Sequence, residues 1–599
     1  MHFLELQAPT LFQHEASCSQ AVQTAKNIVA DIGVNAAAKS SGLVKFSKSR
    51  LGNAERDAHR QFQSRNLRLP IPLAAVGEDD SSTKQPGLRL KDWGSFLLRR
   101  NLWHLVTGLQ NPDKEREAHI WQDFWSKFEE HHPEHNIFSL ARQGVVNLSR
   151  TCALAFHGDE GRGRKKQAFF VCNWYSLLGR GVEAARRMQQ QQKIKQKYLK
   201  QKVNYMGHVY CSRFLCGVLP KHLYKEKETA LSNLFRFAAT ETQAALQEGF
   251  IDSQGVKYHF ACVAVTGDWP FLQKCGSLER TFSTLPKKLP TSDAAPVCKG
   301  ICHLCLAGRG PYPFENLVSS EPSWLSTLYQ ESPFREIPAF ATVAHTPGEL
   351  EALFRFDIWH SFHLGVGKNF LGSAIAMATD YFPGNTIDER FHNMSLCVND
   401  WCRLHGEHLY INQLTKDMIN WPTRKDYPTG GWSKGSTTTV LLRWFVSWSA
   451  GVNSDDILFI KVKEAAQFID QAFTLLYHND DVWLESNLAK RIGQMGVNFL
   501  KRYAECALIS NHRGMCLFIL MPKLHSLQHI FLLDLLHGAS KHSHCLHPLC
   551  FGAQMSEDFI GRTSRLARRT HPKTVMTRVT LRYLTKALQE YVNEGYLQN

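Results

Sequence analysis

The chain has 599 residues, of which 43% are hydrophobic and 21% charged, and these values are typical of globular proteins. Its formal net charge of +16 favours a polyanionic partner, for which nucleic acid is the default choice. The longest apolar run, residues 515–536, is broken by Pro522, Lys523 and several histidines, so we expect no membrane span. The first residues lack the pattern of a secretory signal, and sixteen cysteines without framework spacing suit a reducing compartment. We therefore expect a soluble intracellular protein.

The first 149 residues divide at a polar linker. Residues 1–90 are mixed, polar and basic and end in GEDDSSTKQPG, which predicts a disordered or loosely attached arm. From 91 to 149 apolar residues recur at helical spacing, with many Trp, His and Phe, and predict a small helical region. Because neither part carries a zinc-finger or helix-turn-helix signature, plain helical packing is favoured over a DNA-binding module.

Residues 150–270 follow the order strand, strand, strand, helix, strand. The apolar runs 151–158 and 167–177 flank a Gly-rich turn and predict a β-hairpin. A basic insert precedes a third apolar run, HVYCSRFLCGVL, and an amphipathic helix follows from Leu231 to Ala245. A buried strand at 258–266 closes the set. This order is typical of an RNase H-like core of the α/β (α+β) class, in which the first and fourth strands lie side by side.

The rest of the chain is expected to be mostly helical. Residues 271–520 are too long for a loop and predict a helical insertion into the core. Residues 521–599 predict C-terminal helices that complete the core.

Three acids stand where a metal-dependent DNA-cutting enzyme needs carboxylates. Asp159 ends the first strand of the hairpin, Asp268 closes the strand at 258–266, and Glu557 begins a helix. Two carboxylates at adjacent strand ends and a third from a helix can hold two divalent ions, Mg²⁺ or Mn²⁺. Taken singly, an Asp before Gly or Pro is more often a turn residue.

The helix that starts near Glu557 also carries a basic face, which suits contacts with DNA phosphates. Its basic residues are Arg562, Arg565, Arg568 and Arg569. A salt-bridged surface helix is the plainer alternative.

A C-x-x-C pair, Cys302 and Cys305, predicts a structural zinc site because two thiolates at this spacing can chelate one ion. The further ligands required have several candidates: Cys298, His360, His525 and His529. Two ordinary buried thiols are the alternative, and a redox pair is disfavoured because no strand-to-helix context surrounds the motif.

A D-x-x-H motif, Asp357 and His360, precedes a glycine-rich stretch that ends in Lys368. It is not a nucleotide-binding loop, because the full spacing is missing and Asn369 stands where a magnesium-binding hydroxyl is needed. As an isolated observation, His360 is better explained as a core histidine.

In this order, the motifs resemble those of the CACTA-type (En/Spm) DNA transposases and the related Plavaka and Kyakuja–Dileera–Zisupton groups. The matched features are Gly158-Asp159-Glu160-Gly161, Gly267-Asp268-Trp269-Pro270, Cys302 with Cys305, Asp357 to Lys368, Lys523 to His529, and Glu557, Phe559 and Gly561. The resemblance covers roughly residues 150–570 and implies an RNase H-like DDE core interrupted by a helical insertion. It also implies nuclear DNA strand cleavage and transfer at transposon ends with two Mg²⁺ or Mn²⁺ ions.

The sequence departs from the family's pattern beside the third acid, where Asp558 replaces an arginine and Ile560 replaces a polar residue. The second acid is open between Asp268 and Asp357, and Asp268 is preferred for its strand context. Because no N-terminal recognition module is evident, the alternative function is a catalytically silent, zinc-stabilised nuclear DNA-binding or scaffold protein. Catalytic activity and homo-oligomerisation stay open.

Overall fold

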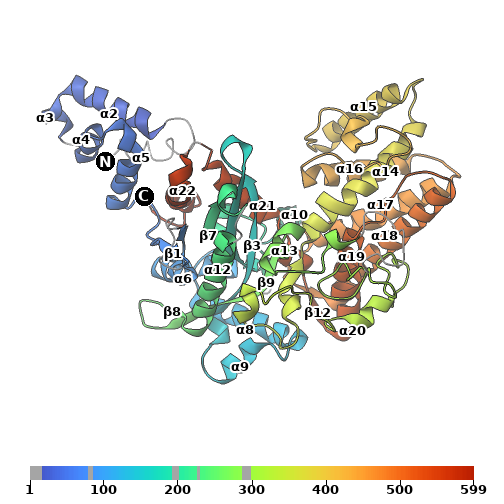
Figure 1. The fold of residues 1–599 in the computed structure, drawn as a ribbon, viewed down its shortest axis with the longest axis horizontal. Coiled ribbons are helices and arrows are strands. Elements are labelled where there is room, and N and C mark those ends of the chain that lie inside the picture. The colour runs from blue at the N-terminus through green and yellow to red at the C-terminus, as the bar shows by residue number, and fades with distance from the viewer. Residues whose placement is uncertain are drawn as a thin grey trace.

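A computed structural model describes residues 17–38, 40–77, 85–191, 201–225, 229–285, 298–568 and 570–598. Figure 1 shows a central sheet with helices against it, a small helical bundle near the N-terminus, and a large helical lobe on the opposite side. The protein therefore combines helices with a mixed sheet, as expected for the α+β class.

The main sheet contains eight strands among the described residues, in the order β1-β2-β7-β4-β3-β9-β10 with β8 beside β9. Their bounds are β1 Ala74–Val76, β2 Gln85–Gly87, β3 Thr151–Arg162, β4 Ala168–Ser176, β7 Arg213–Pro220, β8 Phe250–Ile251, β9 Lys257–Gly267 and β10 Phe354–Phe356. β3 runs antiparallel to β4 and parallel to β9. The predicted hairpin and the predicted neighbourhood of the first and fourth strands are thus confirmed.

One strand lies where we expected only an insertion. β10 pairs in parallel with β9 and extends the sheet beyond it, although it falls inside residues 271–520. The region expected to be a mostly helical insertion therefore also contributes one short strand to the sheet. Three residues are too few to show the alternation by which a strand is recognised in a sequence.

The two faces of the sheet carry different helices. On one face lie α12 (Thr229–Gln247) and α13 (Trp269–Cys275), and Trp174 of β4 donates through Nε1 to Thr242 of α12 at 3.1 Å. On the other face lies α21 (Gln554–Arg565), with α22 (Val575–Asn593) beside it. Because strand side chains alternate, odd-numbered β3 residues such as Asp159 face α21.

The N-terminal region, expected to be a disordered or loosely attached arm, is folded into helices where it is described. It forms α2 Cys18–Ile32, α3 Val34–Ala37, α4 Ser41–Ser47 and α5 Ala54–Ser64 around a small apolar core of its own. Ser17 and Gln20 form a capping box at the start of α2, a signal that the polar composition obscured. Glu55 of α5 forms ion pairs with Arg578 and Arg582 of α22, which tie the bundle to the main body.

The helical region at 91–149 is confirmed, and it belongs to the main body. Its helices are α6 Leu90–Arg99, α7 His104–Thr107, α8 Lys114–His131 and α9 Asn136–Arg142. Trp93 donates to the carbonyl of Leu215 at 3.1 Å, and Trp125 donates to that of Thr151 at 2.8 Å. Both tryptophans join the same core as the sheet.

The helical lobe starts after β10. Its long helices are α14 Gly367–Ala378, α15 Ile387–His405, α16 Gly435–Ala450, α17 Ile457–His478 and α18 Ser486–His512. Two π-helices, at Trp359–Val366 and His529–His537, flank the long helices along the chain. The other short elements are β5 Leu178–Gly179, α10 Glu183–Gln191, β6 Lys202–Val203, α11 Val209–Ser212, β11 Trp483–Glu485, α19 Lys523–Gln528, α20 Gly538–Lys541 and β12 His544–Leu546.

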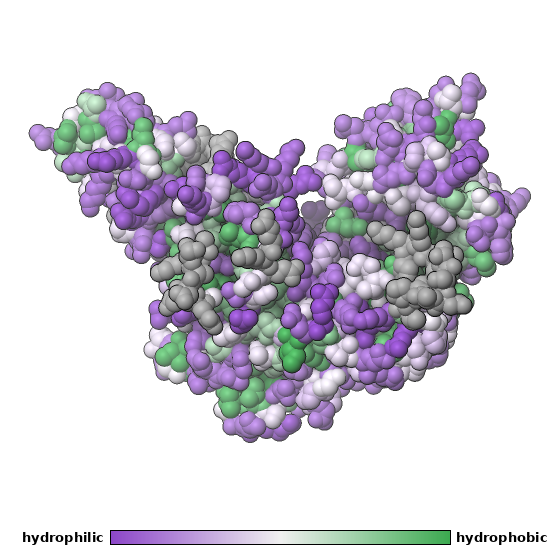
Figure 2. Space-filling view, in the orientation of Figure 1, coloured by the Kyte–Doolittle hydropathy of each residue, from purple (hydrophilic) through white to green (hydrophobic). Residues whose placement is uncertain are grey.

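Two further features concern the surface and helix length. Figure 2 shows that the surface is hollowed between the sheet body and the helical lobe, above the region where Figure 1 places α13 and α21. In the described part of the chain, no helix combines the length and apolarity needed to cross a bilayer.

Candidate acid site and metal centre

The first two predicted acids lie on neighbouring strands: Asp159 is inside β3, which continues to Arg162, and Asp268 directly follows β9. His157 of β3 is paired with Thr266 of β9, and Asp159 and Asp268 each lie two residues beyond that pair. Adjacent strands lie about 4.8 Å apart, so the two carboxyl groups come close together. Burial raises the pKa of Asp159 to about 6, and the neighbouring Asp268 charge adds to the rise.

Each of these acids is held by the backbone beside it. Asp159 Oδ1 accepts from the amide of Glu160 at 2.5 Å. Asp268 caps α13, and its Oδ1 accepts from the amide of Phe271 at 2.8 Å. The Gly-Asp-Trp-Pro sequence thus ends the strand and starts a helix at the acid itself, because an Asp followed by a proline-containing first turn is a good helix start.

The third acid reaches the pair from the opposite layer. Glu557 lies in the first turn of α21, and its Oε1 lies 3.8 Å from Nε2 of His157, two residues before Asp159 on the same face of β3. Burial raises the pKa of Glu557 well above its usual range, and the charges of Asp159 and Asp268 raise it further. The structure therefore brings together all three carboxyl groups predicted from distant parts of the sequence.

The D-x-x-H motif supports this third acid. Asp357 accepts from the amide of Trp359 at 2.8 Å and of Ala553 at 3.0 Å, and from Nδ1 of His360 at 2.6 Å. These hydrogen bonds lower the pKa of Asp357 although its burial opposes this. Since Ala553 directly precedes α21, Asp357 fixes the start of the helix that carries Glu557.

His360, one of the candidate zinc ligands, faces the acids and is not grouped with Cys302 and Cys305. Its Nε2 lies 3.8 Å from Oε1 of Glu557. Burial alone would lower the pKa of His360, but the hydrogen bond and charge of Asp357 raise it to about 9. The imidazole is thus positively charged at neutral pH, and its Nδ1 is committed to Asp357.

Lys523 is a residue near the acids to which no role was assigned from the sequence. Its Nζ donates to the carbonyl of His360 at 3.0 Å. Burial lowers the pKa of Lys523, whereas the nearby charges of Asp268 and Asp357 act to raise it. In the sequence, Lys523 stands out only as the first residue of the matched motif from Lys523 to His529, which assigns it no role.

The second site is a buried cluster of two cysteines and two histidines. Cys302, Cys305, His525 and His529 place their ligand atoms within 4.8 Å of one another. Within the described part of the chain this is the one set of three or more His, Cys, Asp or Glu donors close enough to share an ion. The three acids spread more widely, which two ions separated by about 4 Å would accommodate.

The distances within the cluster are close to those of a zinc site, and two of them are slightly shorter. Cys302 Sγ lies 3.5 Å from Nε2 of His529, Cys305 Sγ lies 3.2 Å from Nε2 of His525, and the two Nε2 atoms are 3.0 Å apart. Bonds of about 2.0 Å to nitrogen and 2.3 Å to sulfur at tetrahedral angles separate ligand atoms by about 3.3–3.8 Å. Two thiols and two imidazoles are a common donor set for structural zinc.

Local structure presents the four donors without rearrangement. The loop with the cysteines is closed by the amide of Ile301 donating to the carbonyl of Ala307 at 2.8 Å, and Arg280 donates to the carbonyl of Cys302 at 2.9 Å. His525 and His529 lie one turn apart where α19 passes into a π-helix. Cys298, also a candidate, lies outside the cluster, and its Sγ faces the carbonyl of Thr284.

Aromatic rings connect the two sites. Trp269, the residue after Asp268, stacks on Phe282 with ring centroids 4.0 Å apart and on Phe356 at 5.8 Å. Phe356 in turn lies 5.3 Å from the ring of His529. The second acid and the Cys/His cluster therefore share one packed wall.

The predicted basic face is exposed and lies beside the hairpin. Arg562, Arg565 and Arg568 are exposed, and Arg562 donates to Asp558 at 2.7 Å. α21 ends at Arg565, so Arg568 lies beyond the helix, and Arg569 lies outside the described residues.

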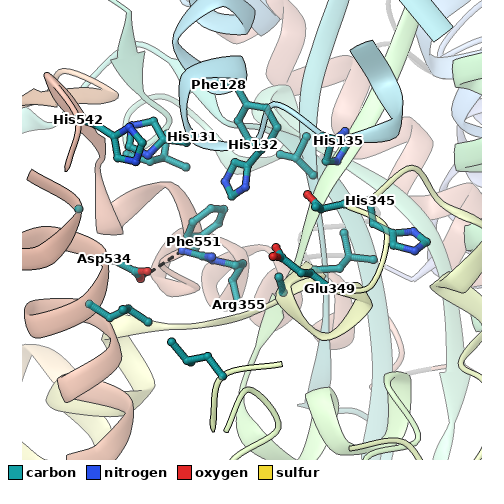
Figure 3. A pocket seen from close by; sticks show the side chains of 18 of the residues that line it. Phe128, His131, His132, His135, His345, Glu349, Arg355, Asp534, His542 and Phe551 are labelled. Atoms are coloured by element: carbon teal, nitrogen blue, oxygen red, sulfur yellow. Dashed lines mark hydrogen bonds and ion pairs between the residues drawn. The ribbon is translucent and has the colours of Figure 1, made fainter. Parts of the chain in front are cut away.

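A cavity of about 310 Å³ lies apart from both sites, and none of their residues lines it. Figure 3 shows histidines from three segments around it, with the rings of His131 and His542 4.0 Å apart. Arg355 of β10 donates to Asp534 at 3.2 Å and lies over the ring of Phe551. Burial lowers the pKa of His132 to about 3, and the Arg355 charge adds to this. These histidines are scattered in the sequence, which gave no sign of the cavity.

Comparison of the sequence with models of protein families and with curated proteins gives no match. The functional argument therefore depends on the geometry of the two sites.

Proposed function

We propose that this protein is a transposase-like enzyme that cuts and joins DNA strands with divalent metal ions at Asp159, Asp268 and Glu557. The observation that carries the proposal is the meeting of these three carboxyl groups, two from adjacent parallel strands and one from a helix on the opposite layer. Nuclear DNA, at the ends of a mobile element, is the proposed substrate.

The order of the strands supports an RNase H-like core. Taken along the chain, β3, β4, β7, β9 and β10 lie in the sheet as β7-β4-β3-β9-β10, and β4 runs against its neighbours. The first strand thus pairs with both the second and the fourth, as an RNase H-like core requires. The helical lobe between β10 and α19 corresponds to the insertion that separates the second acid from the third.

Asp268 suits the role of second acid better than Asp357. Among the described residues, Asp268 accepts a hydrogen bond at Oδ1 from Phe271, which leaves Oδ2 available. Both oxygens of Asp357 are occupied by amides and by His360. Asp357 and His360 are therefore proposed to position Glu557.

The electrostatics of the acids support a cation site. Burial and mutual repulsion raise the pKa of both Asp159 and Glu557, and the positive charge of His360 offsets only part of this rise. Divalent ions at such a site supply Lewis-acid activation of water and of a DNA 3′-hydroxyl. The residues themselves hold the carboxylates in place and, through α21, set exposed arginines nearby for phosphate contacts.

The Cys/His cluster is proposed to hold one structural zinc ion. Its donors join the loop around Cys302 to α19, which lie far apart in the sequence but flank the acid site. Closing these segments around an ion would stabilise the junction between the sheet and the helical lobe.

A plasmid-nicking assay tests the function. The full chain, loaded with zinc, is incubated with supercoiled plasmid and Mg²⁺ or Mn²⁺. We expect Asp159→Asn, Asp268→Asn and Glu557→Gln each to lower the nicking rate by at least about two orders of magnitude, or ~3 kcal/mol. DNA binding should persist, because removing a negative charge does not weaken phosphate contacts.

Neighbouring acids provide matched controls. Glu160→Gln alters the residue beside Asp159, and the Glu160 carboxylate pairs with Lys221. Asp558→Asn alters the residue beside Glu557. Both should retain nicking. A parent chain that binds DNA with steep salt dependence but never nicks it would instead identify the silent, zinc-stabilised DNA-binding protein.

A further inference from the structure

Lys523 places a positive charge beside the acids without a carboxylate partner. It is the first residue of α19, and among the described residues its Nζ has one acceptor, the carbonyl of His360 at 3.0 Å. No carboxylate of the described chain lies within ion-pair distance of Nζ, although the charges of Asp268 and Asp357 act on it. An ammonium has three N–H donors, so two remain for a ligand.

The chain makes room for this side chain at Gly365. The π-helix Trp359–Val366 is broken there, at φ −129° and ψ −107°. A Cβ at Gly365 would lie 2.7 Å from Cδ of Lys523 and 2.7 Å from the carbonyl oxygen of His360. Any larger residue would therefore displace the lysine or the carbonyl that holds it. Interruptions of this kind in helices are frequent at functional sites.

A DNA-cutting site made of three carboxylates needs positive charge for its substrate. The acids repel a phosphodiester, and the exposed arginines of α21 lie further along the helix than Glu557. A lysine acts as a compact point charge toward phosphate oxygens. Of the three cations whose charge acts on Asp268, His360 is paired with Asp357 and Lys274 with Glu160, which leaves Lys523 without a carboxylate partner among the described residues. Half-buried Lys368 stands near Lys523.

The Cys/His cluster fixes where α19 begins. His525 lies two residues after Lys523, and His529 follows one turn later. Ser526 Oγ contacts Ser361 Oγ at 2.9 Å, and Gln528 donates to the carbonyl of Asn316 at 2.8 Å, so both sides of the helix are anchored. A shift of the cluster would move Lys523 relative to the acids.

We propose that Lys523 binds a phosphate oxygen of the DNA backbone at the acid site and that the Cys302/Cys305/His525/His529 cluster positions it there. The proposal rests on the function proposed above. It assigns Lys523 to substrate binding and gives the cluster an influence on DNA contacts in addition to stability.

Fluorescence anisotropy of a short DNA duplex tests this inference. The full zinc-loaded chain is titrated in Ca²⁺, used in place of Mg²⁺ to limit cleavage, over a series of NaCl concentrations. We expect Lys523→Met to weaken binding roughly 10-fold. It should also reduce the slope of log K against log salt by about 0.9, the contribution of one phosphate contact. Lys523→Arg should restore most of the slope.

Two further variants separate contact from structure. Gly365→Ala keeps the lysine but displaces it, so it should reproduce most of the loss seen with Lys523→Met. Lys490→Met removes an exposed lysine of α18 and should leave affinity and slope unchanged. Zinc content and melting temperature serve as checks, because a purely structural lysine would change the melting temperature without changing the salt slope.

The cluster's part is tested with His529→Cys, which keeps four zinc donors on a shorter side chain. Retained zinc with a weaker, less salt-dependent affinity supports positioning, whereas retained zinc with parental affinity refutes it. If the parent nicks plasmid and Lys523→Met binds DNA like the parent, the assignment of Lys523 is wrong and the proposed function stands. If the parent neither binds nor nicks DNA, the proposed function and the assignment of Lys523 are both wrong.

Discussion

The acid site and the Cys/His cluster are both assembled from distant segments, but the pKa values of their donor groups shift differently. In the cluster, Cys305 and the two imidazoles lower the pKa of Cys302 well below its usual range although burial opposes this, whereas burial and Cys302 raise the pKa of Cys305. In the acid site, burial and like charges raise the pKa of Asp159 and Glu557. One thiol of the cluster thus favours its charged form and the cluster is closed from solvent, whereas burial and like charges disfavour the charged forms of Asp159 and Glu557.

Exposure follows the same division. All four cluster residues are buried, but the side chain of Glu557 is 29% exposed. Closed sites with four protein ligands are typical of structural zinc, and catalytic sites keep positions open for water and substrate. The comparison therefore predicts that perturbing the two sites will change stability in opposite directions.

The largest effect is expected from breaking the cluster. Cys302→Ser removes one thiolate of the proposed zinc site, so stoichiometric zinc should be lost and the free energy of unfolding should fall by more than about 3 kcal/mol. Elemental analysis and chemical denaturation measure both quantities. Cys298→Ser, four residues earlier and outside the cluster, should keep zinc and stability. If the Cys302→Ser protein has parental stability, Cys302 and Cys305 are ordinary buried thiols and not zinc ligands.

The two sites also differ in how far the sequence revealed them. Asp159 and Asp268 could be predicted because each follows an apolar run in the sequence, and this signal is local. The cysteine pair was found from its spacing, but the choice among distant histidines needed the structure. His360 was kept among the zinc candidates because its hydrogen bond with Asp357 and its approach to Glu557 depend on how α21 packs.

The elements missed are those whose signals are short or diluted. β10 has three residues, and its partner β9 lies far away in the sequence, so no periodicity marks it. The N-terminal bundle is small and surrounded by polar residues, although the capping box of Ser17 and Gln20 marked its first helix. The position of the Lys523 side chain depends on the space that Gly365, far away in the sequence, leaves for it.

The second largest effect concerns a buried histidine outside both sites. His547 lies before α21, and its Nε2 donates to the carbonyls of Leu476 and Asn479 at 3.1 Å while Nδ1 accepts from the amide of Leu549. Burial lowers the pKa of His547 from 6.5 to about 4. The unfolded chain therefore takes up the proton first, and the contribution to stability is complete above pH 6.5 and is lost as the pH falls toward 4.

The expected size of this pH effect is about 2–3 kcal/mol, from a shift of about two pKa units. Urea denaturation of the parent and of His547→Gln at pH 7 and pH 4.5 measures it. The stability difference between the two proteins should shrink at the lower pH. His571→Gln, at an exposed position, is the control and should leave the pH dependence unchanged. A difference that is the same at both pH values would rule out this role for His547.

A smaller effect of opposite sign is expected at the acid site. Since the pKa of Asp159 is raised to about 6, its charge at neutral pH destabilises the fold when no divalent ion is added. Asp159→Asn should therefore raise the free energy of unfolding by about 1–2 kcal/mol at pH 7.5. Glu160→Gln, which loses its pairing with Lys221, should not stabilise.

Added Mg²⁺ or Mn²⁺ sharpens the same comparison. Because an ion that binds only the folded state stabilises it by mass action, the melting temperature of the parent should rise with ion concentration. Asp159→Asn should show little of this rise. If Asp159→Asn lowers stability as Cys302→Ser does, the acid site is structural and the contrast between the two sites is wrong.

The smallest effect is expected at the exposed arginines beside the acids. Arg565 and Arg568 lie on the surface, and Arg562 donates to Asp558. Each phosphate contact contributes mainly counterion release, so Arg565→Ala and Arg568→Ala should each weaken DNA binding a few-fold and reduce the salt slope by about 0.9. Stability should change by less than about 0.5 kcal/mol, because surface substitutions rarely do more.

A matched arginine far from the acids completes this test. Arg403 of α15 is 78% exposed and pairs with Asp400, so Arg403→Ala removes equal charge from the helical lobe. If DNA lies across α21, Arg403→Ala should leave the slope unchanged while the α21 variants lower it. Equal losses from both places would mean that the net charge of +16 attracts DNA without a defined path. The acid site would then have no adjacent basic surface that binds DNA phosphates, and Lys523 would be the remaining local contact to test.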